Sequence, residues 1–189
     1  MVRSTLSRPP SPSLSPKGER GGVPVYVFDV CNWQQGIESI QTLGELTACE
    51  AAAKRIADEA SAGFDELRRA PGPTAAYLLW KKPYMVAGGR TYIDSVMELC
   101  GLRNVFAASP ERYPTVTVTN LREQQPEFVL LSSEPYAFGD EHVVELAAQL
   151  PRSRVVRVDG EMFGWYGSRM IPAAAYLREM LARELRVES

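Results

Sequence analysis

Apolar residues follow two different periods along residues 23–189, one typical of buried strands and one typical of amphipathic helices. Short β-branched or aromatic runs predict strands, at residues 23–28, 75–80, 104–106, 128–131 and 154–159. Apolar positions spaced by three or four predict helices, at residues 32–43, 91–100, 119–124, 140–150 and from Pro172 onward. Strands that alternate with such helices favour an α/β fold, with a mostly parallel sheet covered on both faces.

A longer helical pattern separates the first predicted strand from the others. It begins at Thr47, which has the spacing of a capping box with Glu50, and it ends before Pro71. A helix over residues 47–70 would exceed about 30 Å, because each residue adds ~1.5 Å. This length is enough to connect two lobes.

Residues 1–22 differ in composition from the rest of the chain. They are rich in Ser, Pro, Gly and basic residues, so we expect a disordered tail. The tail lacks the apolar segment of a secretory signal peptide. No apolar run in the chain is long enough to span a membrane. We therefore divide the chain into a tail (1–22), a strand with a short helix (23–46), a long helix (47–70) and an α/β lobe (71–189).

Composition and charge exclude some classes of function. The 189 residues are 45% hydrophobic and 23% charged, with a formal net charge of -2, which is typical of a folded protein without affinity for nucleic acid. The three cysteines, Cys31, Cys49 and Cys100, show no metal or redox spacing, and we expect them to act as small apolar residues.

Motifs for catalysis, cofactors or metals are missing from the sequence. It contains no dinucleotide-binding glycine fingerprint, Walker loop or nucleophile elbow. The single histidine, His142, stands in a predicted helix between acidic residues, and we expect it to be a hydrated surface residue. Glu134 is one carboxylate without an evident partner. We therefore predict a protein that is not an enzyme and that holds no cofactor or metal ion.

Large aromatic side chains gather in the loops that follow the predicted strands. In an open parallel sheet these loops converge where ligands bind, at the carboxyl ends of the strands. The concentration of rings predicts a broad apolar surface with few charges, suited to a large ligand. The candidate ligand-binding residues are Trp80, Tyr84, Met85, Tyr113, Glu134, Tyr136, Trp165, Tyr166 and Arg169.

Four stretches of the chain resemble one known family. They are LGELT at 43–47, WKKPYMVAGGRTYIDSVMELCGLRNVF at 80–106, LSSEPYAFGDEH at 131–142 and DGEMFGWYGSRM at 159–170. In this order and spacing they resemble the second half of the cobalamin and metal-chelate (helical-backbone, class III) periplasmic substrate-binding proteins of ABC transporters. The resemblance implies two Rossmann-like α/β lobes of three layers, joined by a long helix, with a corrinoid, haem or siderophore between them.

The resemblance also assigns roles to the segments. It implies that residues 23–46 are the last part of an amino-terminal lobe, that 47–70 is the connecting helix and that 71–189 is the carboxyl-terminal ligand-binding lobe. It implies a periplasmic location and an ABC permease as partner. Thr119 stands where the family commonly has an acidic docking residue. The first lobe is represented only by its end, so we expect a truncated chain with weakened ligand binding.

Two other functions stay open at this point. The chain could be a vestigial or protein-interaction α/β module with no ligand of its own. It could also be a Rossmann-like enzyme, in which case replacement of Glu134 or Arg169 would abolish turnover.

Overall fold

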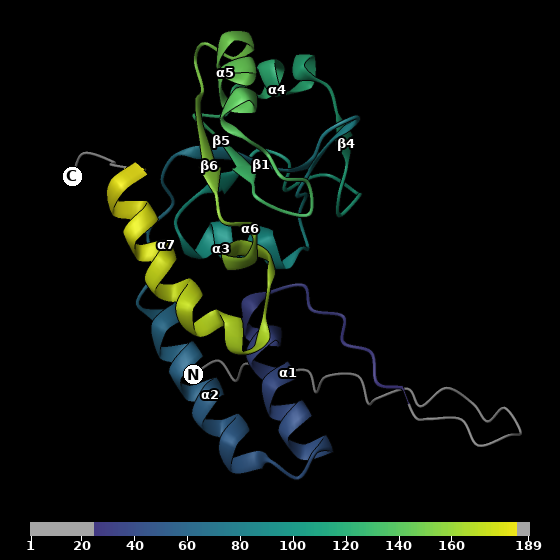
Figure 1. The fold of residues 1–189 in the computed structure, drawn as a ribbon, viewed down its shortest axis with the longest axis vertical. Helices are drawn as coiled ribbons and strands as arrows, with labels where there is room; N and C mark the ends of the chain where they lie inside the picture. Colours follow the sequence, from purple (N-terminus) through teal and green to yellow (C-terminus); the bar gives the residue numbers. More distant parts are fainter. Residues whose placement is uncertain (1–24, 185–189) are drawn as a thin grey trace, which may run out of the picture.

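The computed structural model describes residues 25–184 as a six-stranded sheet between helices (Figure 1). The tail predicted over residues 1–22 lies outside the described residues, as do residues 23 and 24 of the first predicted strand. Within residues 25–184, no helix has the length and apolar character needed to cross a bilayer.

The sheet has the strand order β4-β2-β1-β5-β6, with β3 paired to the start of β1. Its centre is parallel and consists of β1 (Thr74–Trp80), β5 (Phe128–Ser132) and β6 (Arg154–Val158). The short strands are β3 (Arg103–Asn104), which is parallel to β1, and β2 (Tyr84–Val86) and β4 (Thr115–Val116), which form antiparallel pairs. The mostly parallel sheet was expected, and the two antiparallel pairs were not.

Both faces of the sheet are buried, because successive side chains of a strand point to opposite faces. Ala75 and Tyr77 of β1 face one apolar cluster, whereas Ala76 and Leu78 face the other. The first cluster is closed by α3 (Tyr92–Leu99), α6 (Gly160–Gly164) and α7 (Met170–Glu184), and the second by α4 (Val118–Gln124) and α5 (Asp140–Gln149). This arrangement confirms the expected three-layer α/β lobe.

The segment before the first helix differs from its prediction. Residues 25–28 form no strand, and Val25 and Val27 are 72% and 79% exposed. A β-branched run becomes a strand only where another strand pairs with it, and none of the described strands lies against this segment.

The first two helices also differ from their predicted bounds. Helix α1 spans Trp33–Leu46 and begins at Asn32, as predicted, since the Asn32 side chain accepts a hydrogen bond of 2.8 Å from the Gln35 amide. Thr47 ends this helix instead of starting the next one, because its hydroxyl donates to the carbonyl of Leu43 at 2.8 Å. The predicted helix at 47–70 is therefore shorter and forms α2, the 16 residues Glu50–Asp65.

Helix α2 packs against α1 and α7 (Figure 1). Helix α1 continues through Gly44, beyond its predicted end at residue 43. A Cβ at Gly44 would lie 2.3 Å from the Cβ of Ala53, so the glycine permits close contact with α2. Gly63 has the same role toward α7, where its Cβ would lie 2.8 Å from the Cβ of Ala174. Ala57, Ala60 and Phe64 of α2 are at most 1% exposed, so this helix is part of the lobe's core.

Candidate functional site

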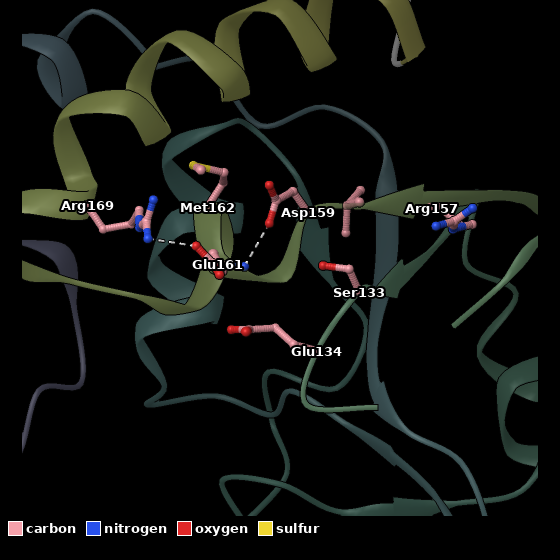
Figure 2. A pocket seen from close by; sticks show the side chains of 8 residues that line it. Ser133, Glu134, Arg157, Asp159, Glu161, Met162 and Arg169 are labelled. Carbon is pink, nitrogen blue, oxygen red and sulfur yellow. Dashed lines mark hydrogen bonds and ion pairs between the residues drawn. The ribbon is translucent and has the colours of Figure 1, made fainter. Parts of the chain in front are cut away.

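The carboxyl ends of β1, β5 and β6 lie at one edge of the sheet, because the three strands are parallel. The loops after β5 and β6 line an open cavity of about 630 Å³ there (Figure 2). Its lining residues are Ser133, Glu134, Arg157, Val158, Asp159, Glu161, Met162 and Arg169. The position agrees with the general placement of ligand sites in open α/β sheets.

Hydrogen bonds fix the loop after β5 to the sheet and to the loop after β6. The Tyr77 hydroxyl donates to the Ser132 hydroxyl at 3.0 Å, and burial raises the pKa of Tyr77 far above its ordinary value. The Ser132 hydroxyl in turn contacts the backbone of Glu134. The Gly160 amide donates to the Ser133 hydroxyl at 2.9 Å. The cavity is therefore built on the rigid centre of the sheet.

Trp165 is held at the rim of this cavity by two charged residues. Its indole nitrogen donates to the carboxylate of Glu134, and the guanidinium of Arg169 lies 5.8 Å from the centre of its ring. Arg169 is itself paired with Glu161 at 2.9 Å. The Trp165 side chain is oriented by these contacts while the residue is 50% exposed.

Trp80 lies at the end of β1 and contacts the same loop after β5. Its ring packs edge-on against Tyr136 at a centroid distance of 5.8 Å, and the residue is 39% exposed. Residues 133–138, which we name the bridging loop, thus touch Trp80 through Tyr136 and Trp165 through Glu134. Five of the predicted site residues are brought together by these contacts, namely Trp80, Glu134, Tyr136, Trp165 and Arg169.

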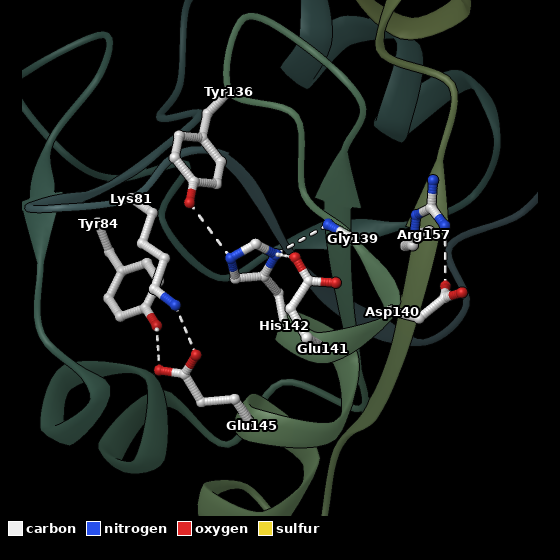
Figure 3. A network of polar contacts seen from close by, with 9 residues as sticks. All are labelled: Lys81, Tyr84, Tyr136, Gly139, Asp140, Glu141, His142, Glu145 and Arg157. Carbon is white, nitrogen blue, oxygen red and sulfur yellow. Dashed lines mark hydrogen bonds and ion pairs between the residues drawn. The ribbon is translucent and has the colours of Figure 1, made fainter.

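His142 is buried, so the prediction of a hydrated surface histidine is wrong. Its Nδ1 accepts a hydrogen bond of 2.8 Å from the Gly139 amide, and its Nε2 lies 3.2 Å from the Tyr136 hydroxyl (Figure 3). His142 lies in the first turn of α5, and its imidazole packs edge-on against the rings of Tyr136 and Phe138. His142 therefore stabilises the bridging loop through its contacts with Tyr136 and Phe138.

Tyr84 is engaged in a second polar cluster, with Lys81 and Glu145 (Figure 3). The Glu145 carboxylate accepts from the Tyr84 hydroxyl at 3.5 Å and from the Lys81 ammonium at 2.5 Å. The hydrogen bond from Lys81 lowers the pKa of Glu145, and the same bond raises the pKa of Lys81. Lys81 is thus paired with Glu145.

Replacing Glu145 by glutamine is expected to remove a small, acid-sensitive part of the stability. The pKa of Glu145 is lower in the folded chain, so the ion pair stabilises above the ordinary value of 4.5 and its contribution is lost as pH falls through the lowered pKa. The effect should not exceed about 1 kcal/mol, because the pair is partly exposed. Urea unfolding of both proteins from about pH 7 to about pH 3 should show their difference shrinking. A difference that grows on acidification would contradict this assignment.

None of the remaining predicted residues lines the cavity. Tyr166 packs on Tyr92 at a centroid distance of 5.8 Å, toward α1 and α3. Met85 lies on β2 beside Trp80 and is half-buried. Tyr113 was expected in a loop after the carboxyl end of a strand. It lies just before β4, which pairs with β2, and it does not line the cavity. No aromatic or hydrogen-bond contact among residues 25–184 joins Tyr113 to Trp80 or Trp165.

The cavity is more highly charged than the sequence suggested. Five of its eight lining residues carry a charge, whereas a surface with few charges was expected. Arg157 and Asp159 were missed as site residues because the prediction favoured aromatic rings. Their place at the end of a predicted strand was the available signal, since such residues point into the crevice of an open sheet.

Comparison with known proteins settles the family. The sequence profile of the family described as periplasmic binding protein matches residues 13–149. The chain belongs to this family. The family predicted from the four sequence stretches is therefore confirmed.

Relatives within the family carry the name vitamin B12-binding protein. The one from Photorhabdus laumondii is 26% identical over 168 residues, which are 85% of this chain and 59% of the relative. The one from Vibrio parahaemolyticus is 25% identical over 137 residues, which are 70% of this chain and 50% of the relative. The chain thus spans between half and three fifths of the length of these two relatives.

Solved structures of periplasmic binding proteins share the fold. The periplasmic vitamin B12 binding protein of Vibrio cholerae superposes with a TM-score of 0.67 at 16% identity, over 84% of this chain and 65% of that one. The periplasmic heme binding protein of the same organism gives a TM-score of 0.66 at 22% identity, over 80% and 64% of the two chains. At such identities these likenesses establish the α/β fold alone.

Proposed function

We propose that this chain provides a ligand-binding lobe of the substrate-binding component of an ABC importer, and that its ligand is a corrinoid or a related metal chelate. The observation that carries the proposal is the pair of exposed tryptophans, Trp80 and Trp165, held by one bridging loop at the carboxyl edge of the sheet. Flat aromatic surfaces bind large planar ligands through stacking and burial of apolar area.

The comparisons support the same class of ligand. The relatives are named for vitamin B12, and structures with the same fold are named for vitamin B12 and heme. We extend these ligands to this chain as part of the proposal, together with a periplasmic location and an ABC permease as partner. The permease would meet α4, where Thr119 is exposed at the position of the expected acidic docking residue.

Binding of cobalamin is the direct test, and both tryptophans should contribute to it. Replacement of Trp80 or Trp165 by alanine is expected to weaken binding about ten-fold, because each lost ring contact is worth roughly 1–2 kcal/mol. Equilibrium dialysis followed by the visible absorbance of the corrin avoids reliance on tryptophan emission. Val144→Ala is the control, since Val144 is 70% exposed on α5. Absence of saturable binding by the unaltered chain at high micromolar ligand would overturn the proposal.

A second candidate function is a protein-interaction module without its own ligand. It is favoured by exposed apolar residues at the other end of the molecule, with Leu43 and Leu46 of α1 at 53% and 55% exposure. This function requires a stable complex or dimer covering those residues, which size-exclusion chromatography of the chain and of a Leu43→Ser variant would detect.

A further inference from the structure

Three carboxylates occupy the middle of the cavity at the end of β5 and β6. Figure 2 shows Glu134, Asp159 and Glu161 between Arg169 on one side and Arg157 on the other. Three carboxylates and two guanidinium groups give this lining a formal net charge of −1. Within residues 25–184, no cluster of these side chains has the arrangement of a metal site. All three carboxylates line the cavity.

The two arginines are already paired with carboxylates of the chain. Arg169 lies 2.9 Å from Glu161, and Arg157 lies 2.8 Å from Asp140, which is outside the cavity. An arginine engaged in this way attracts a further anion less strongly, because its partner's charge opposes the approach. The positive charge of each guanidinium is therefore partly offset by a carboxylate of the chain before a ligand enters.

The other two carboxylates are hydrogen-bonded to neutral groups. Glu134 accepts from the indole nitrogen of Trp165, and Asp159 accepts from the backbone amide of Glu161 at 3.0 Å. Neither forms an ion pair with a basic residue in the part of the chain that the structure describes. Each carboxylate has further lone pairs that can accept hydrogen bonds from a ligand. The cavity thus offers acceptors and negative charge to the ligand beside Trp165.

Corrinoids and porphyrins differ in the chemistry that such a cavity would meet. The edge of a corrin in vitamin B12 carries uncharged amides, whose N–H groups donate hydrogen bonds. Haem carries two propionates, which are anionic at neutral pH and only accept. Like charges brought together at a binding surface oppose association, whereas donor–acceptor pairs support it.

We propose that this cavity selects chelates edged with amides over chelates edged with carboxylates, and that Glu134 and Asp159 supply the discrimination. This inference rests on the proposed function, because it assumes that a chelate lies against Trp165. It narrows the ligand class to corrinoids with intact amide side chains. Haem and carboxylate siderophores are disfavoured by the same two residues.

The test uses two ligands with the same ring and different edges. Dicyanocobinamide carries peripheral amides, and dicyanocobyrinic acid carries carboxylates in their place. We expect the full chain to bind the amide form about ten-fold more tightly or better in equilibrium dialysis at low ionic strength. Added salt should narrow the gap, since mobile ions screen exposed charges over about 10 Å at 0.1 M. Haemin, measured in parallel, should follow the carboxylate form.

Two substitutions remove a carboxylate charge from the cavity while keeping the size of the side chain. Glu134→Gln keeps an oxygen that can accept from Trp165, and Asp159→Asn keeps an oxygen that can cap α6. Each should improve binding of the carboxylate form about five-fold, or roughly 1 kcal/mol, relative to the amide form. Glu59→Gln is the control, because Glu59 is exposed on α2 outside the cavity and its loss changes net charge alone.

The outcomes distinguish this inference from the proposed function. If both corrinoids bind equally well, or if the preference survives in both variants and at high salt, the charge-based selection is wrong while chelate binding stands. If neither corrinoid nor haemin binds, the proposed function itself fails. If the Glu134→Gln variant does not fold, the Asp159→Asn variant and the salt dependence of binding still test the charge-based selection.

Discussion

Replacing Phe64 by alanine is expected to lower the free energy of unfolding by about 3–5 kcal/mol. Phe64 lies on α2, is fully buried and packs against Trp33 of α1 with ring centroids 5.9 Å apart. Truncation would leave a cavity where three helices meet, and the close contacts at Gly44 and Gly63 limit how far these helices could collapse. Urea unfolding followed by circular dichroism measures the loss.

The matched control for Phe64 is Lys54→Ala on the same helix. Lys54 is exposed, and its one ion pair within residues 25–184 is with Asp58, one turn away. Its removal should therefore change the stability by less than about 0.5 kcal/mol. A loss below about 1 kcal/mol for Phe64→Ala would contradict the conclusion that α2 belongs to the core of the lobe. A large loss in a single cooperative transition would support it.

Replacing Gly160 by alanine is expected to destabilise the lobe by up to about 3 kcal/mol and to disturb the cavity rim. The added Cβ would lie 2.3 Å from the Ser132 hydroxyl oxygen and 2.6 Å from Cγ of Glu134. Ser132 is bonded to Tyr77 inside the sheet, so the strain is relieved most easily by moving Glu134. Glu134 would then release the indole of Trp165, which tryptophan emission would report.

Gly164→Ala is the control for Gly160, because it changes the same residue type in the same short helix. A Cβ at Gly164 meets nothing within 4 Å, so this variant should be as stable as the parent chain or slightly more so. Equal stability of the two variants would show that the turn after β6 tolerates a side chain, contrary to the contacts of Gly160.

The regular elements that were predicted well have strong local patterns. β1 and β5 carry continuous apolar runs, and α3 has helical spacing. Thr91 caps α3, because its hydroxyl oxygen accepts a hydrogen bond of 3.1 Å from the Asp94 amide. The antiparallel pairs of β2 and β4 could not be found this way. Strands of two or three residues are too short to show a period. They form because β2 returns along the edge of β1 and β4 pairs in turn with β2.

The errors around α2 arose where one local signal fits two structures. Thr47 has the residue type of a helix start, yet its hydroxyl caps the end of the preceding helix. Gly44 has the residue type of a helix break, yet it serves close contact with Ala53. Tertiary packing decides between such alternatives. The residues next to Thr47 or Gly44 in the sequence do not show which distant helix will pack there.

The sequence indicated the loops of the candidate site but not its charged lining. The loops after β1, β5 and β6 were singled out because ligand sites of open parallel sheets lie at the carboxyl ends of the strands and because these loops carry aromatic residues. The three strands are parallel and end at one edge. The many aromatic residues in these loops favoured the prediction of an apolar surface. Arg157 and Asp159, which line the cavity, were therefore not predicted as site residues. Charged residues beside a strand resemble ordinary hydrated surface residues until their partners are known.

The bridging loop makes the two exposed tryptophans energetically dependent on each other. A ligand that shifts Trp165 displaces Glu134, and the displacement passes along a few peptide units to Tyr136 and so to Trp80. The losses of binding free energy in Trp80→Ala and Trp165→Ala should therefore not be additive in the double variant, because each substitution disturbs the loop that holds the other tryptophan. A ligand that contacts one of the two tryptophans would therefore also change the position of the other.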